Sequence, residues 1–144
     1  MENMDTINLL KECDAGTKMA VSTIDEVLEN TRDDKMKDLL TESKEHHEKL
    51  GNEVHSLLIE YHSEEKEPNV MAKGMSWLKT NMKMGMNEDD STIADLITDG
   101  CNMGVKSLYR YLNKYSAANH TVQNICRRLA TIEEKLCKNL QPYL

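Results

Sequence analysis

The sequence predicts an all-α protein, a single four-helix bundle in which a long helical crossover joins the second and third long helices. Apolar residues recur at steps of three and four along most of the 144 residues, which is the spacing of one helix face. Only two prolines and six glycines occur, fewer than the many turns of an all-β chain require. A chain of this length holds one domain, which we expect to span residues 1–144.

The first two helices are expected near residues 4–29 and 33–63. Their short connection requires them to lie antiparallel, and Thr31 or Asp33 can cap the second helix. The apolar face predicted for the first helix consists of Leu10, Cys13, Thr17, Ala20, Ile24 and Val27. The face predicted for the second consists of Met36, Leu39, Ser43, His46, Leu50, Val54, Leu57 and Tyr61.

A crossover helix is expected near residues 70–86, after a stop at Pro68, and two further long helices near 90–116 and 120–140. Seventeen helical residues span about 25 Å at about 1.5 Å per residue, so the crossover can return the chain to the far end of the bundle. The third long helix is then parallel to the second. The apolar faces predicted for the last two helices are Ile93, Ile97, Cys101, Gly104, Leu108, Tyr111 and Tyr115, and Val122, Ile125, Leu129, Ile132, Leu136 and Leu140.

A short internal repeat favours two similar hairpins. Residues 13–18 (CDAGTK) align with residues 101–106 (CNMGVK), on equivalent positions of the first and third long helices. The repeat places Cys13 and Cys101 at related core positions, where they form either a redox-active pair or two packed, reduced thiols.

Composition excludes several classes of protein. The 18 basic and 25 acidic side chains give a net charge of −7, which disfavours nucleic acid as a partner. No stretch approaches the roughly 20 apolar residues of a membrane span, and the N-terminus lacks the basic-then-apolar pattern of a signal peptide. We therefore expect a cytoplasmic protein. The four cysteines have no C-x-x-C spacing, so no structural zinc site is predicted.

Two motifs resemble those of a known superfamily. Residues 77–79 (WLK) lie in the expected crossover, and residues 101–104 (CNMG), followed by Tyr109 and Tyr111, lie in the third long helix. Together they resemble a small bacterial branch, of uncharacterised function, of the ferritin-like superfamily, and the similarity in layout covers most of residues 5–140. The resemblance implies a ferritin-like crossover bundle. Metal-using members hold two irons with a Glu from each of two helices and Glu-x-x-His from each of the others.

The predicted inward positions contain almost none of these ligands. They are Cys13, Thr17 and Ala20, then Ser43 and His46, then Cys101 and Gly104, then Leu129 and Ile132. We therefore expect no complete di-iron site, no cofactor and no catalytic residue, and predict a non-catalytic binding or interaction protein that forms a homodimer. The alternative is a metal- or redox-linked protein that uses His46, Cys13 and Cys101 to hold a divalent metal. His46 is otherwise a core histidine hydrogen-bonded to Ser43 or Thr17.

The expected crossover carries basic side chains and no acidic one, in an acidic protein. Such a helix either packs its methionines on the bundle or offers a surface to a protein partner or a membrane. The candidate residues of that surface are Met75, Trp77, Lys79, Met82 and Lys83.

Overall fold

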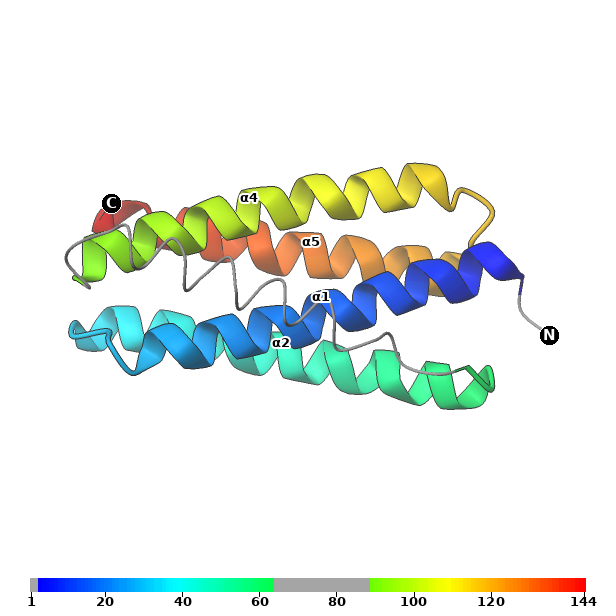
Figure 1. Cartoon of the computed structure of the whole chain (residues 1–144), viewed down its shortest axis with the longest axis horizontal. Coiled ribbons are helices and arrows are strands. Elements are labelled where there is room, and N and C mark those ends of the chain that lie inside the picture. The colour runs from blue at the N-terminus through cyan, green and yellow to red at the C-terminus, as the bar shows by residue number, and fades with distance from the viewer. Residues whose placement is uncertain (1–2, 64–88) are drawn as a thin grey trace.

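The computed structural model describes residues 3–63 and 89–144, and this part of the chain is all-helical, without strands. Figure 1 shows its four long helices packed side by side. They are α1 (Met4–Leu28), α2 (Asp34–Glu60), α4 (Asp90–Lys114) and α5 (His120–Leu140), followed by a short 3-10 turn, η1 (Gln141–Tyr143). The all-α prediction is confirmed, and each predicted helix boundary lies within three residues of the observed one. The predicted crossover helix at 70–86 lies outside the described residues.

All four helices begin at a side chain that caps the first turn. In each case an Asn or Asp oxygen accepts a hydrogen bond from the backbone N–H three residues on, which satisfies one of the free donors of the helix start. The four caps are Asn3, Asp33, Asp89 and Asn119. Asp33 is one of the two cap candidates that the sequence offered for the second helix.

Hydrogen bonds at the two ends of the bundle fix the direction of the helices. At one end the Asp90 carboxylate accepts from the backbone N–H groups of Arg32 and Asp33, both at 2.8 Å. At the other end the Thr6 hydroxyl accepts from the N–H of Asn119 at 2.8 Å. Thus α4 starts beside the start of α2, and α1 starts beside the start of α5. The helices of each pair run parallel (Figure 1), so residues 63 and 89 lie at opposite ends of the bundle, as the predicted crossover requires.

Asp90→Ala is expected to lower the free energy of unfolding by about 1–2 kcal/mol, because two charge-assisted hydrogen bonds that hold the α1–α2 loop against α4 are lost. Urea unfolding measures the change. Asp95→Ala is the matched control, since Asp95 is an exposed carboxylate on the same helix and is expected to change stability by less than about 0.5 kcal/mol. Equal effects of the two substitutions would show that Asp90 does not hold the loop.

The hydrophobic core is divided into two clusters along the bundle axis. One contains Cys13, Leu50 and Leu129, and the other contains Ile24 and Leu40. The described part of the chain has seven buried polar residues, and five of them lie between the two clusters along the helix that carries them. These five are Asp14, Thr17, Ser43, His47 and Glu133. The middle of this bundle is therefore a polar layer between two apolar ends.

The predicted face of α2 is wrong at three positions, each by one residue. Its buried residues are Met36, Leu40, Ser43, His47, Leu50, Val54 and Leu58, whereas the prediction placed Leu39, His46 and Leu57 inside. At each of these positions two identical residues are adjacent, so the periodicity fits either rotation of the helix. On α5, likewise, Glu133 is buried while the predicted Ile132 is only half-buried.

Candidate ligand-binding cavity

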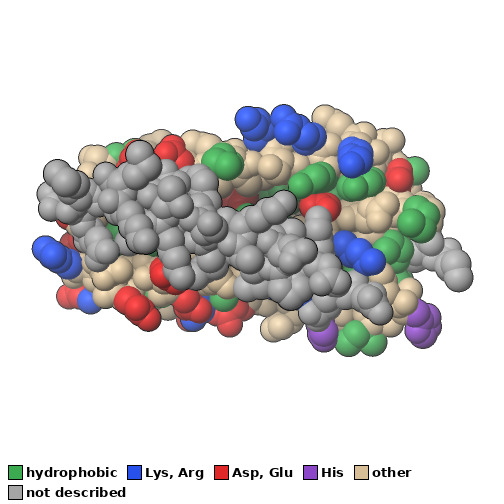
Figure 2. Space-filling model, in the orientation of Figure 1, with side chains coloured by type: hydrophobic (Ala, Val, Ile, Leu, Met, Phe, Trp, Pro, Cys, Tyr) green, Lys and Arg blue, Asp and Glu red, His purple; other side chains and the backbone are tan. Residues whose placement is uncertain are grey.

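A cavity of about 330 Å³ lies between α1 and α4, in the middle of the bundle. Small residues face each other across it: Ala15, Gly16 and Ala20 on α1, and Gly100 and Gly104 on α4. A Cβ atom added at Gly100 would meet no other atom within 4 Å, so open space adjoins this wall. Figure 2 shows the surface hollowed near α4, with hydrophobic and acidic side chains at the edge of the hollow.

Glu133 of α5 brings a carboxyl group to the wall of this cavity. This residue is buried, with 9% exposed, and its Oε2 atom has no hydrogen-bond partner among residues 3–63 and 89–144. Burial raises the pKa of Glu133 to about 8, because a carboxylate loses its hydration there. Gly104 lies opposite the carboxyl group, where a Cβ atom would be 2.5 Å from Oε2, so any larger residue at this position would displace the group.

His47 of α2 reaches the same cavity with a second unpaired polar atom. Its Nδ1–H donates to the backbone oxygen of Ser43 at 2.8 Å, which leaves Nε2 as a hydrogen-bond acceptor. The residue is only 1% exposed, and none of the described residues gives Nε2 a hydrogen-bond partner. Burial lowers the pKa of His47, so the ring is neutral at pH 7.

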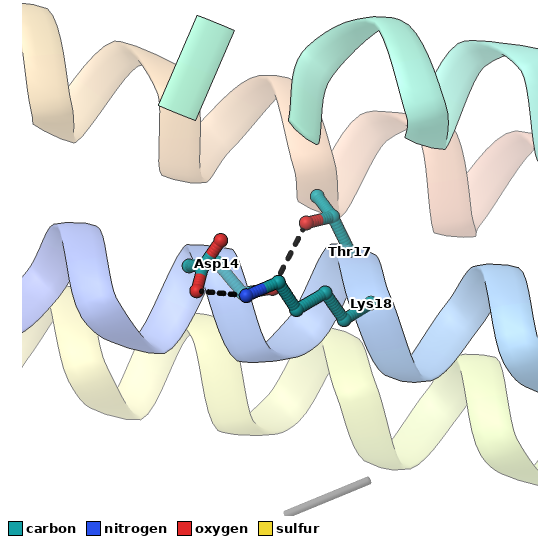
Figure 3. A network of polar contacts seen from close by, with 3 residues as sticks. All are labelled: Asp14, Thr17 and Lys18. Carbon is teal, nitrogen blue, oxygen red and sulfur yellow. Dashed lines mark hydrogen bonds and ion pairs between the residues drawn. The ribbon is translucent and has the colours of Figure 1, made fainter. Parts of the chain in front are cut away.

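Asp14, the other acidic residue of the polar layer, is in a different situation (Figure 3). The Lys18 ammonium lies 3.0 Å from its Oδ2 atom, and the Thr17 hydroxyl donates to its backbone oxygen at 3.0 Å. A buried carboxylate with a neighbouring cation is compensated within the fold. Glu133 differs, because burial alone accounts for its shifted pKa.

The rest of the cavity wall is mainly apolar, with the hydroxyl groups of Thr23 and Ser107 as neutral polar members. Glu12 of α1 and Tyr111 of α4 lie at the wall, and burial together with the nearby Glu12 carboxylate raises the pKa of Tyr111. Among the described residues, neither Lys nor Arg lines the cavity. Its two polar atoms without partners, Glu133 Oε2 and His47 Nε2, therefore have no protein cation beside them in this lining.

The structure does not bring the predicted metal or redox residues together. The prediction that His46 lies in the core is wrong, since its side chain is 45% exposed on the outer face of α2. Cys13 and Cys101 are buried as predicted, but they belong to different core clusters. Cys13 contacts Cys126 instead, and the hydrogen bond between these thiols, with burial, raises the pKa of Cys13. Within residues 3–63 and 89–144, no three His, Cys, Asp or Glu residues are grouped to hold a metal ion.

The expectation that no carboxylate points inward is also wrong, because Asp14 and Glu133 are both buried. Sequence reasoning missed Glu133 because the apolar face predicted for this helix contained the neighbouring Ile132 instead. The signal that could have found the cavity is the cluster of small residues at related positions of α1 and α4. The predicted partner or membrane surface at Met75, Trp77, Lys79, Met82 and Lys83 lies outside the described residues.

Comparison with known protein families, with characterised proteins and with solved structures finds no match to this chain. Across the described ranges, no helix has the length and apolar character needed to cross a bilayer.

Proposed function

We propose that this chain is a non-catalytic binding protein whose cavity between α1 and α4 holds a small, mainly apolar molecule. The observation that carries the proposal is a pair of buried polar atoms, Glu133 Oε2 and His47 Nε2, which have no hydrogen-bond partner within the described part of the chain and lie beside a cavity of about 330 Å³. Buried polar groups in folded proteins are almost always hydrogen-bonded. Ligand sites combine an apolar wall with a few such groups, in volumes of about 300–1,000 Å³.

The proposed scaffold is a ferritin-like crossover bundle. Two features support it: α2 runs parallel to α4, and the chain joins opposite ends of the bundle between residues 63 and 89. In such bundles, ligand sites are built in the core from side chains on facing helices, and the cavity here is lined by all four described long helices. Formation of a homodimer remains a prediction, which native mass spectrometry tests.

Naphthalene, an uncharged hydrocarbon, is the probe for the cavity itself. On titration, we expect saturable shifts of the amide NMR signals of Gly16, Gly100 and Gly104, with one molecule bound per chain. Gly100→Leu and Ala20→Leu fill the cavity from opposite walls, and each is expected to weaken binding by at least about tenfold, because the added carbons occupy the space of the ligand.

Asp99→Leu is the matched control for this titration. It introduces the same side chain on the same helix, but at an exposed residue outside the cavity lining, and is expected to leave naphthalene binding unchanged. Shifts spread over the whole surface, or equal binding by all three leucine variants, would contradict the proposed site.

A further inference from the structure

The two unpaired atoms of the cavity favour a ligand that donates hydrogen bonds. His47 Nε2 can only accept, because the ring's single hydrogen is committed to the Ser43 carbonyl. Glu133 becomes a pure acceptor once it ionises. A ligand with several N–H donors on one atom can satisfy both groups, whereas an ether, ketone or carboxylate cannot.

The charges at the cavity favour a cation over an anion. The two carboxyl groups of Glu12 and Glu133 line it, and no lysine or arginine does so among the described residues. Every helix of the bundle contributes titratable groups near Glu133: Glu12 from α1, His47 from α2, Cys101 and Tyr111 from α4, and Cys126 from α5 itself. The imidazole is the one basic group in this set, and it is neutral.

We propose that the cavity binds an amine with an apolar body, whose ammonium group donates to the Glu133 carboxylate and to His47 Nε2. This inference rests on the proposed function, since it names the ligand class of the same cavity. The apolar body lies against the small and aliphatic residues of α1 and α4. An ammonium group carries three N–H donors, and a carboxylate that is desolvated in this way pairs strongly with a cation.

Binding of the ammonium has a defined proton balance. In the empty cavity the Glu133 carboxyl is protonated at pH 7, because burial raises its pKa to about 8. The bound cation stabilises the carboxylate, so the carboxyl proton leaves to solvent and an ion pair remains. Each molecule bound therefore releases about one proton, and the affinity for the ammonium rises about tenfold per pH unit until the pH approaches 8.

Three compounds share a phenyl ring on a short carbon chain and differ in their polar head group, so they show which head group the cavity prefers. They are 4-phenylbutylamine, 4-phenylbutan-1-ol and 4-phenylbutyrate. Calorimetric titrations at pH 7 in buffers of different ionisation enthalpy give both the affinity and the protons released. We expect the amine to bind at least about tenfold more tightly than the alcohol, with release of about one proton. The carboxylate is expected to bind most weakly, because neither a lysine nor an arginine among the described residues lines the cavity to neutralise it, and His47 Nε2 can only accept.

Substitution of the carboxyl group tests its role directly. Glu133→Gln keeps the shape but cannot ionise, and we expect the amine to lose its advantage over the alcohol and its proton release. Glu134→Gln is the matched control, since Glu134 is the exposed neighbour on the same helix; its amine affinity and proton release are expected to match those of the unsubstituted protein.

The outcomes distinguish the ligand class from the site. Equal or tighter binding of the alcohol or the carboxylate would overturn the amine proposal. Failure of all three compounds in a protein that still binds naphthalene would also overturn it, while the binding function would stand. Failure of naphthalene and of all three compounds would remove both.

Discussion

Glu133→Gln is expected to stabilise the protein at neutral and alkaline pH and to remove most of the dependence of its stability on pH between about 4.5 and 8. The folded-state pKa of about 8 lies above the ordinary value of 4.5. In this window the unfolded chain has lost the Glu133 proton while the folded chain retains it, so the free energy of unfolding falls as the pH rises. At about 1.4 kcal/mol per pH unit, the fall amounts to at most about 5 kcal/mol.

Urea unfolding at several pH values from 4.5 to 8 measures this effect. The variant and the unsubstituted protein are expected to differ little at the acidic end, and their difference should grow with each unit of pH. Glu134→Gln, at the exposed neighbouring position, should reproduce the slope of the unsubstituted protein. A Glu133→Gln variant that keeps this slope would mean that the Glu133 carboxyl ionises normally in the folded state.

Leu40→Ala is expected to lower the free energy of unfolding by about 3 kcal/mol, within the usual range of about 2–5 kcal/mol for a buried leucine. Leu40 is fully buried in the cluster that also contains Val27 and Ile93, so truncation removes apolar contacts and leaves a void. Leu39→Ala is the matched control, because this neighbour is only half-buried, and a loss of about 1 kcal/mol is expected.

Chemical denaturation of the two variants gives the loss of unfolding free energy for each. Comparison of the two losses shows which face of α2 packs into the core. A larger loss for Leu39→Ala than for Leu40→Ala would reverse the assignment of the inner face. It would also place His46 in the core in place of His47, and would remove one of the two polar atoms on which the cavity argument depends.

The sequence was sufficient for the helices and their ends. Long apolar periodicity predicted the four described helices, and Asp33, one of two cap candidates, lies where the second of them begins. It was insufficient for the rotation of α2, because Leu39 and Leu40, or His46 and His47, are chemically identical neighbours. Packing against α1 and α5 decides which residue of each pair is buried. These contacts join residues far apart in the sequence, so the local sequence pattern does not contain them.

The cavity could not be derived from the sequence for a related reason. A cavity is a property of the spacing between helices, and small residues such as Gly100 permit that spacing without specifying it. Glu133 is buried with its carboxyl group beside Gly104 of another helix, where a larger residue would displace it. Ordinary periodicity places a glutamate in solvent, so a buried and unpaired one is visible only in three dimensions.

The most direct test of this account is the ¹³C NMR signal of the Glu133 side-chain carboxyl, assigned by its disappearance in Glu133→Gln. In the free protein, the signal is expected to titrate with a pKa of about 8 and to report a protonated group at pH 7. Addition of 4-phenylbutylamine at pH 7 should move it to the position of a carboxylate. A carboxyl that titrates near 4.5, and does not respond to the amine, would contradict both the buried acid and the ligand that it is proposed to bind.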